Sequence, residues 1–427
     1  MEILFTNPPF VEEVDGHMRY GINAGSRWPW SSQDVASDYI PFPFFMAYAV
    51  SMLKQAGADV DLYDSVAVQE FNYESYYQHI KEMNPKIIVI ETSTPTIHLN
   101  LQVAERLSQI IPSVEIALCG PHATVFAEEL IKLPYITYIL KGEYELNSIV
   151  MWQTKHPGIY EYISIDDIDS SPYPYRDPKV INNYWDQSMD PHRPQLQIYA
   201  SRGCPYSCVY CMWPPVMYKG KYRARSAMAV ANEIRYCVDS FDSRSIFFDD
   251  DTFNLGNERI SILCDELKKI GLPWSMMGRT DTSPLWLFDK MIDCGCTGFR
   301  FGIETFSERI QKVINKKLNP KIAIEVLSYL STKYPQVKIR LTTIKGLPTE
   351  TEEDRQYNVK IITDLGFDGH FCPHTHQCAT CIPFPGTPLY DSLKEQGHGE
   401  ALKDFSMYDG DPNKSNTLTK LITEMKE

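Results

Sequence analysis

Short apolar runs alternate with amphipathic segments over residues 1–150 of the chain. Each run has the length and composition of a buried strand, and the runs are Ile3–Thr6, Val60–Tyr63, Lys86–Ile90, Glu115–Leu118 and Tyr138–Leu140. The segments between them predict helices at 44–56, 74–83, 98–111 and 125–133. Buried strands that alternate with helices form a doubly wound, parallel α/β sheet, and ligands of such sheets bind at the carboxyl ends of the strands. The pattern therefore predicts a Rossmann-like N-terminal domain over residues 1–150.

A proline-rich stretch separates this pattern from a second one. Residues 151–195 mix acidic and aromatic residues with prolines, among them those at positions 172, 174, 178, 191 and 194. This composition is typical of an interdomain linker.

Six strand–helix repeats follow the linker. The predicted strands lie near 196–201, 244–249, 273–278, 298–303, 337–344 and 377–382. The predicted helices lie near 227–240, 257–270, 284–294, 307–315 with 320–333, and 351–364; Ser226 and Asp354 stand at helix starts, and Gly271, Gly295 and Gly366 at helix ends. Six such units are two short of a complete (β/α)8 barrel. We therefore expect a partial barrel over 196–390 and a short, acidic helical tail over 391–427.

Composition and charge narrow the class of protein. With 43% hydrophobic and 22% charged residues the chain is an ordinary globular protein, and no apolar run is long enough to span a bilayer. The net charge of −14 disfavours nucleic acid as the main partner, because neutralising phosphates needs a basic face. The eleven cysteines are an odd number and indicate a reduced, cytoplasmic thiol set.

Cys204, Cys208 and Cys211 are the strongest chemical signal. Their C-x3-C-x2-C spacing offers three thiolates from one loop, whereas a closed zinc site or a ferredoxin cluster takes four ligands. Three ligands suit an iron–sulfur cluster with one open iron. The alternative is three reduced thiols in a turn.

Distinctive polar segments also follow the predicted strands of both domains. In the first domain they are Asn7-Pro-Pro-Phe10, Glu91-Thr-Ser-Thr-Pro-Thr96, Cys119-Gly-Pro-His-Ala-Thr124 and Lys141-Gly-Glu-Tyr-Glu145. In the second they are Phe247-Phe-Asp-Asp-Asp-Thr-Phe253, Gly278-Arg-Thr-Asp281, Gly298-Phe-Arg-Phe-Gly-Ile-Glu304, Ile344-Lys-Gly-Leu-Pro-Thr-Glu350 and Pro383-Phe-Pro-Gly-Thr-Pro-Leu389. Because strand carboxyl ends share one edge of a sheet, each set is expected to form one site.

In order and spacing these motifs resemble radical S-adenosylmethionine (radical SAM) enzymes that carry a cobalamin-binding domain, a family of class B methyltransferase type. The resemblance implies a [4Fe-4S] cluster, S-adenosyl-L-methionine and cobalamin as cofactors. It implies that a 5′-deoxyadenosyl radical takes a hydrogen from the substrate and that methylcobalamin supplies the methyl group. The expected activity is methylation of an unactivated carbon of a small molecule, with an electron donor such as flavodoxin or ferredoxin as partner.

The resemblance also assigns roles to residues of the second domain. Cys204, Cys208 and Cys211 are the cluster ligands, and Tyr210 lies against the adenine. The other implied contacts with the cosubstrate are made by Asp250 and Asp251 to its amine, Arg279 to its carboxylate, Glu304 to its ribose, and Gly346 and Leu347 to its adenine. Alternatives are a calcium or surface carboxylate cluster for the aspartates, a structural Asp–Arg pair for Arg279 and an ordinary turn at Gly346.

For the first domain the resemblance implies corrinoid contacts by the strand-end loops, at Ser93, Thr94, Gly120, His122, Gly142 and Glu143. The chain departs from the family pattern in two places, since Cys119 and Tyr144 replace glycines of G-G-x-H-x-T and G-E-G-E. The D-x-H-x-x-G signature of a cobalt-ligating histidine is absent. A scaffold domain without a corrinoid is the alternative.

Two features lie outside the family pattern. The insertion Val11–Tyr39 contains Gly25-Ser-Arg-Trp-Pro-Trp30 and is expected to cover the corrinoid or the substrate, although Arg27 alone is equally consistent with a surface ion pair. The second is a set of His and Cys residues, namely His370, Cys372, His374, His376, Cys378 and Cys381. It is interpreted as substrate-pocket lining, with a second metal site as alternative. Asp250 and Cys381, a thiol able to donate a hydrogen atom, are the candidates for direct catalytic roles.

Two rival functions remain at this point. One is a radical SAM cyclase, rearrangement or oxidation enzyme without net methyl transfer, and the other is a non-catalytic corrinoid- or cluster-binding sensor.

Overall fold

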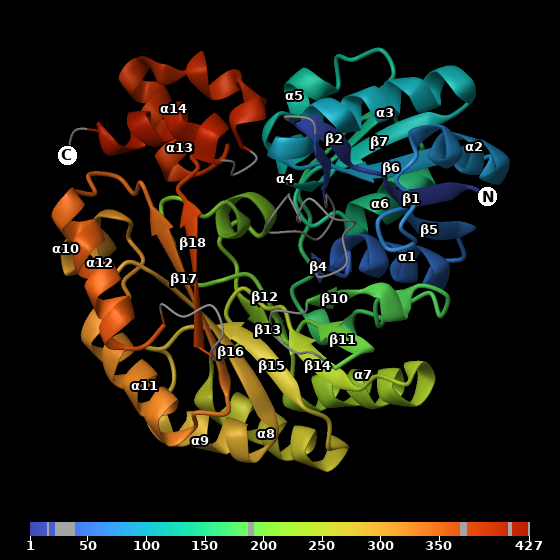
Figure 1. Ribbon diagram of the computed structural model, residues 1–427. Coiled ribbons are helices and arrows are strands. Elements are labelled where there is room, and N and C mark those ends of the chain that lie inside the picture. The colour runs from blue at the N-terminus through green and yellow to red at the C-terminus, as the bar shows by residue number, and fades with distance from the viewer. Residues whose placement is uncertain (15–16, 22–38, 187–191, 368–373, 409–411, 426–427) are drawn as a thin grey trace. The chain divides into compact units, whose positions relative to one another are not determined.

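The computed structural model describes residues 1–14, 17–21, 39–186, 192–367, 374–408 and 412–425 (Figure 1). The chain forms two compact units. The first comprises Met1–Trp185, Pro215–Lys219 and Asp404–Gly410, and the second comprises Asp186–Pro214, Gly220–Lys403 and Asp411–Glu427. Each unit contains its own six-stranded sheet.

The sheet of the first unit is parallel and doubly wound, as predicted. Its strand order is β5 (Val60–Asp64), β1 (Ile3–Asn7), β6 (Ile87–Glu91), β7 (Glu115–Cys119), β8 (Tyr138–Leu140) and β9 (Gly158–Tyr160). All neighbours run parallel. The strand order reverses at β1, because β5 lies on one side of it and β6 on the other. The loops at this topological switch point belong to the carboxyl edge where ligands of such sheets bind.

Six helices accompany this sheet among the described residues. They are α1 (Phe44–Gln55), α2 (Tyr73–Met83), α3 (Ile97–Ile110), α4 (Gly120–Val125), α5 (Ala127–Leu130) and α6 (Glu145–Thr154). The first three match the predicted ranges closely. In place of one helix at 125–133 there are two, and α4 begins earlier because Pro121 in its first turn suits a helix start.

Helix α6 and strand β9 were not predicted. Strand β9 is the edge strand of the first sheet and falls within residues 151–195, which the sequence indicates as a linker. It has three residues, begins with glycine and is too short to carry an alternating pattern. The first sheet thus continues past residue 150. The boundaries of the domains stay a prediction.

The second unit has the partial-barrel arrangement expected from six strand–helix repeats. Its parallel strand order is β11 (Gln195–Ile198), β14 (Ser245–Phe248), β15 (Trp274–Gly278), β16 (Cys296–Glu304), β17 (Lys338–Lys345) and β18 (His374–Thr380). The helices around the outside of this sheet (Figure 1) are α7 (Ala227–Phe241), α8 (Asn257–Ile270), α9 (Leu285–Asp293), α10 (Glu308–Val313), α11 (Pro320–Lys333) and α12 (Glu352–Asp364).

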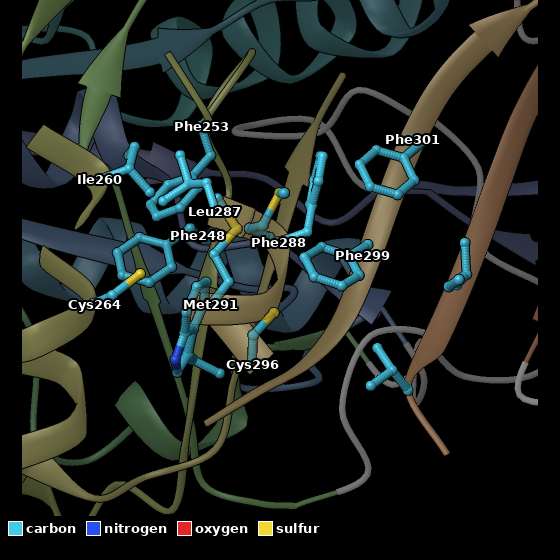
Figure 2. Close-up of a cluster of buried hydrophobic side chains, with 14 of the residues drawn as sticks. Phe248, Phe253, Ile260, Cys264, Leu287, Phe288, Met291, Cys296, Phe299 and Phe301 are labelled. Atoms are coloured by element: carbon cyan, nitrogen blue, oxygen red, sulfur yellow. The ribbon is translucent and has the colours of Figure 1, made fainter. Parts of the chain in front are cut away.

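Buried apolar residues between these strands and helices form the core of the second unit. Figure 2 shows the aromatic centre of this core, where Phe248 and Phe253 lie with ring centroids 4.4 Å apart and Phe299 stacks on Phe301 at 5.4 Å. Burial of such large side chains contributes the main stabilisation of a domain. This core holds the strand ends, and therefore the loops that follow them, in fixed positions.

Local capping explains where the helices of the second unit begin. The Ser226 side chain accepts from the backbone N–H of Ala229, which confirms the predicted start of α7. Helix α12 begins with a capping box in which Thr351 is the N-cap and Asp354 its N3 partner, so the start lies three residues before the predicted signal.

The remaining elements are short. Helices α13 (Pro388–Leu393) and α14 (Pro412–Thr423) follow β18, in line with a helical tail. The others are β2 (Val11–Val14), β3 (His17–Tyr20), β4 (Tyr39–Ile40), β10 (Trp185–Asp186), β12 (Ser201–Arg202), β13 (Arg223–Ala224), and the single turns η1 (Thr94–Thr96), η2 (Ile168–Ser170), η3 (Ile181–Asn183), η4 (Trp213–Met217), η5 (Lys394–His398), η6 (Ala401–Lys403) and η7 (Phe405–Tyr408). None of the helices in the described part of the chain has the length and apolar character needed to cross a membrane.

Candidate functional site

Cys204, Cys208 and Cys211 lie on the loop that follows β12 in the second unit. All three are free thiols that are partly buried. The backbone N–H of Val209 donates to the carbonyl of Ile314 at 3.0 Å, and the carbonyl of Val209 accepts from the N–H of Leu389 at 3.0 Å. The segment after α10 and the first turn of α13 therefore fix the middle of the Cys loop.

The thiols of this loop act on one another electrostatically. Burial raises the pKa of Cys204 and of Cys211, and the Cys208 thiol and the Asp251 carboxylate raise both further. Within the described ranges no three His, Cys, Asp or Glu side chains converge on one point suited to a single metal ion. A cubane cluster makes a different demand, because each thiolate binds its own iron at a separate corner. The donor set and spacing thus fit a cluster better than a mononuclear ion.

The two candidate aspartates after β14 have different surroundings. Asp250 is fully buried, and its carboxylate accepts from the backbone N–H of Ala200 at 3.1 Å and from the Ser201 hydroxyl. Burial raises the pKa of Asp250 to about 6. Asp251 is partly buried and is the carboxylate that raises the pKa of the cysteines. Asp250 therefore holds the segment that joins β11 to β12, whereas Asp251 acts electrostatically on the thiols.

Glu304 ends β16 with a left-handed backbone, at φ +65°, and its carboxylate is 2.9 Å from the Lys316 ammonium. Burial disfavours the charge on Lys316, but the Glu304 carboxylate outweighs it and raises the Lys316 pKa. Burial also raises the pKa of the Tyr210 hydroxyl, and Glu304, Cys208 and Cys211 raise it further. The structure thus brings Tyr210, Glu304 and the cysteines together.

Arg279 is already paired in the structure. Its guanidinium makes a two-pronged contact with the Asp281 carboxylate at 2.9 and 2.8 Å, donates to the Lys316 carbonyl at 3.1 Å and lies 3.8 Å from the ring centroid of Tyr206. This geometry is that of the structural Asp–Arg pair named above as the alternative. A contact with the cosubstrate carboxylate stays a prediction.

The turn after β17 is tightly enclosed. Gly346 has φ +74°, and a Cβ there would lie 2.5 Å from Cγ2 of Thr419. The Gly346 N–H donates to the Glu350 carboxylate at 2.7 Å, and Leu347 is fully buried. Cys381 is buried beside this turn, since its backbone N–H donates to the Lys345 carbonyl at 2.9 Å. Burial raises the pKa of its thiol, and the Glu350 and Glu304 carboxylates raise it further.

In the first unit, the strand-end residues form two small groups. Thr94 and His122 are buried, with the Thr94 hydroxyl 3.1 Å from Nδ1 of His122, while the Ser93 hydroxyl lies 2.8 Å from that of Thr96. The His122 ring packs against Phe126 and Phe405, and burial lowers its pKa to about 3. His122 is therefore a neutral imidazole at neutral pH.

Two glycines of this edge have positive φ and close neighbours. A Cβ on Gly120 would lie 2.7 Å from the carbonyl oxygen of Thr92, and a Cβ on Gly142 would lie 2.0 Å from the Tyr162 ring. The Tyr162 hydroxyl donates to the buried Glu143 carboxylate at 3.0 Å. Both positions therefore require glycine for contacts within the protein.

The two departures from the family pattern meet in the structure. The Tyr144 hydroxyl donates to the Glu91 carboxylate at 2.5 Å, and the Cys119 thiol interacts with both Tyr144 and Glu91. All three are buried, and the Tyr144 ring packs near Phe5 and Phe45. A buried polar group thus occupies the place where the family has two glycines.

Three of the six His and Cys residues in and around β18 have described side chains. The Thr343 hydroxyl contacts Nε2 of His376 at 2.6 Å, the Cys378 side chain is exposed and Cys381 is buried. His370, Cys372 and the side chain of His374 lie outside the described part of the chain, as does Gly25–Trp30 with Arg27. Pocket lining by this strand stays a prediction.

Sequence reasoning missed three side chains of the second-unit site. They are Lys316, which pairs with Glu304; Thr252, whose hydroxyl is 3.4 Å from Sγ of Cys204; and Tyr206, which lies under Arg279. Thr252 lies in the Phe247–Phe253 motif and Tyr206 lies between Cys204 and Cys208. The hydroxyl of the first and the aromatic ring of the second could have indicated a role in the site. Lys316 follows a predicted helix and carries no local signal.

Family profiles match both units of the chain. Residues 198–360 match the radical SAM superfamily, and residues 35–148 match the B12 binding domain. The chain is 26% identical over 372 residues to an uncharacterized methyltransferase of Pyrococcus horikoshii. The alignment covers 82% of this chain and 78% of the relative. It is 23% identical over 398 residues to the anaerobic magnesium-protoporphyrin IX monomethyl ester cyclase of Cereibacter sphaeroides. That alignment covers 86% of this chain and 62% of the relative.

Solved structures share the fold. The radical S-adenosylmethionine methyltransferase TsrM of Kitasatospora setae, with cobalamin and a [4Fe-4S] cluster bound, aligns with a TM-score of 0.69 at 13% identity over 93% of this chain and 76% of that one. The cobalamin-dependent S-adenosylmethionine radical enzyme OxsB aligns with a TM-score of 0.62 at 16% identity over 84% of this chain and 59% of that one. At these identities the likeness establishes the fold.

Proposed function

Because this chain is a member of the radical SAM superfamily with a B12-binding domain, we propose that it is a cobalamin-dependent radical SAM methyltransferase. Its proposed reaction is the methylation of an unactivated carbon of a small molecule. The observation that carries the proposal is the presence of both family matches on one chain, together with the Cys loop at residues 204–211. The relative named as a methyltransferase adds support over most of the chain.

Cys204, Cys208 and Cys211 would hold the cluster, leaving one iron for the cosubstrate. When bound, the cluster supplies the electron that cleaves S-adenosylmethionine. Asp251, rather than Asp250, would meet the cosubstrate's amine, because both oxygens of Asp250 already accept from Ala200 and Ser201. Asp250 would act by positioning the segment between β11 and β12.

Glu304 would accept hydrogen bonds from the ribose hydroxyls. Its second oxygen keeps that capacity while Oε1 accepts from Lys316. Tyr210, beside Glu304 and Cys208, would lie against the adenine, and the turn at Gly346 and Leu347 would present backbone groups to it. Arg279 would hold the loop through Asp281 and Tyr206, and reach the cosubstrate carboxylate only with its remaining N–H groups.

The first unit would bind the corrinoid at the carboxyl edge of its sheet. The hydroxyls of Ser93 and Thr94, the close-packed glycines Gly120 and Gly142, and the buried His122 and Glu143 offer an edge of small and polar groups that suits a planar ligand with amide side chains. When bound, cobalamin supplies the methyl group. The protein positions both reactants and excludes water.

A second candidate function is a radical reaction without net methyl transfer. The cyclase of Cereibacter sphaeroides matches 86% of this chain, a larger share than the methyltransferase relative does. Product mass separates the two, since methylation adds one carbon and cyclisation adds none.

Anaerobic reconstitution tests the proposal. We expect iron, sulfide and cobalt in the purified protein, and 5′-deoxyadenosine when a reductant and S-adenosylmethionine are added. A variant with Cys204, Cys208 and Cys211 changed to alanine should lose the iron and sulfide, whereas one with the buried core residues Cys237 and Cys264 changed to alanine should keep them. Bound corrinoid or cluster without any 5′-deoxyadenosine would instead indicate a sensor.

The proposal includes a cytoplasmic location and an external one-electron donor. An oxygen-labile cluster and an odd number of cysteines suit a reducing compartment. A small molecule is the expected substrate, because the chain is acidic and offers little for binding nucleic acid.

A further inference from the structure

A hollow lies on the surface of the second unit, between the end of α10 and the start of α11. Its volume is about 590 Å³, and its lining includes Lys312, Lys317, Lys321, Asn315 and Glu308. The three lysines are exposed. Lys321 and Glu308 lie 3.5 Å apart as a solvent-exposed pair, which stabilises little and leaves the lining with an excess of positive charge.

This basic hollow is bonded directly to the Cys loop. The Asn315 side chain donates to the carbonyl oxygen and to the hydroxyl of Ser207, at 3.0 and 2.9 Å, and the carbonyl of Ile314 accepts from the N–H of Val209. Ser207 and Val209 are the chain neighbours of Cys208 on either side. The lining segment is thus the protein surface adjoining one proposed cluster ligand.

We propose that the basic hollow of Lys312, Lys317 and Lys321 docks an acidic one-electron carrier protein that reduces the cluster. The inference rests on the proposed function, because it presupposes a cluster on the Cys loop. One electron leaves the reduced carrier and enters the oxidised cluster, and no atom is transferred. A partner docked there lies against Asn315, which bonds to Ser207, the chain neighbour of Cys208.

The basic hollow differs in sign from the net charge of the whole chain. At a net charge of −14 the molecule as a whole repels an acidic partner. At physiological ionic strength, however, charges are screened beyond about 8 Å, so the local surface decides where an acidic protein settles. Complementary charge at such a patch raises association rates about 10-fold or more and makes them fall with added salt.

A charge-reversal variant tests the proposal. Lys312→Glu, Lys317→Glu and Lys321→Glu are combined in one reconstituted protein, and the rate of cluster reduction by a purified flavodoxin hydroquinone is measured by stopped flow at low and high salt. The matched control combines Lys268→Glu, Lys360→Glu and Lys394→Glu, which changes net charge equally at exposed positions of other elements. Reduction by dithionite, a small reductant that needs no docking site, is measured alongside.

We expect the flavodoxin rate of the first variant to fall about 10-fold at low salt and its salt dependence to flatten, with the control variant close to wild type. The dithionite rate should be equal in all three proteins, which shows that each still folds and holds its cluster. Equal flavodoxin rates in the two variants would overturn the proposal. A wild-type protein that forms no cluster, and so gives no signal with dithionite, would instead refute the proposed function.

Discussion

The ammonium of Lys316 lies 2.9 Å from the carboxylate of Glu304, and both side chains are buried. Removing one partner leaves the other as an uncompensated charge, so we expect Lys316→Met to lower the free energy of unfolding by about 3 kcal/mol. The double variant Glu304→Gln/Lys316→Met should recover part of that loss. Urea unfolding of the apoprotein measures the coupling, and simple additivity of the two changes would contradict it.

The same pair predicts a binding effect. Glu304→Gln loses a charged acceptor for the ribose hydroxyls, so S-adenosylmethionine should bind the reconstituted protein about 10-fold more weakly. Titration calorimetry measures this, with cluster content as the control for folding. Affinity equal to wild type would exclude Glu304 from the cosubstrate site.

A pH dependence follows from Asp64 at the end of β5. Its buried carboxylate accepts from Asn7, Val66, Ala67 and Tyr184, yet burial outweighs these bonds and raises its pKa from 3.8 to about 6. Below pH 3.8 the group is protonated in both states. Between pH 3.8 and about 6 Asp64 is ionised in the unfolded chain but still protonated in the folded protein. The free energy of unfolding therefore falls as the pH rises to about 6, by about 3 kcal/mol in total.

Asp64→Asn removes that dependence. Unfolding free energies are measured between pH 4 and 7 for the wild type and the variant. Toward pH 7 the wild type should lose stability relative to the variant. Asp242→Asn, at a side chain that is 82% exposed, serves as the comparison and should follow the wild type. Parallel curves for wild type and Asp64→Asn would contradict the assignment.

The buried bond from Tyr144 to Glu91 predicts a stability effect in the first unit. Tyr144→Phe keeps the ring against Phe5 and Phe45 but leaves the Glu91 carboxylate without this donor, at a cost of about 1–3 kcal/mol. Glu91→Gln in the same background should restore part of the loss, because a neutral amide is cheaper to bury. Thermal unfolding of the wild type, the Tyr144→Phe variant and the double variant measures both effects. An unchanged Tyr144→Phe protein would show that the bond contributes little.

Cys381 is the candidate hydrogen-atom donor for the second candidate function, in which the substrate radical would take the thiol hydrogen and the external one-electron donor, with a proton from solvent, would restore the thiol. In Cys381→Ser the hydroxyl holds its hydrogen more strongly than a thiol, so under that function the ratio of product to 5′-deoxyadenosine should fall while iron and sulfide stay at wild-type levels. Cys237→Ser, at a buried position of α7, is the matched control. Equal ratios in all three proteins would remove Cys381 from the reaction.

Periodicity predicts the longer strands of the two six-stranded sheets because their apolar runs are buried on both faces, whereas the three-residue edge strand β9 carries no such pattern. Strands β14 and β15 match the predicted 244–249 and 273–278 within a residue at each end. Strand β18 begins at His374 instead of 377, since its first residues are polar and belong to the sheet only through their pairing with β17. Tertiary pairing overrides local composition there.

Residue types predicted the members of the candidate site but not their orientation. Asp250 and Asp251 are adjacent acids with the same signal, and only packing against Ala200 and Ser201 distinguishes them. Arg279 pairs with Asp281 because of its side-chain rotamer. The spacing of residues in the sequence does not determine that rotamer. The contact of Lys316 with Glu304 joins the turn after α10 to the end of β16, and it appears only when the fold is known.

The Asp250 clamp on Ala200 and Ser201, at one end of the Cys loop, and the bonds of Val209 to Ile314 and Leu389, further along it, join protein atoms only and need no iron as a partner. Much of the conformational freedom that metal insertion would otherwise remove is already gone. An iron-free chain should therefore accept its cluster after folding, in the test tube as well as during synthesis, and loading should change its melting temperature only modestly.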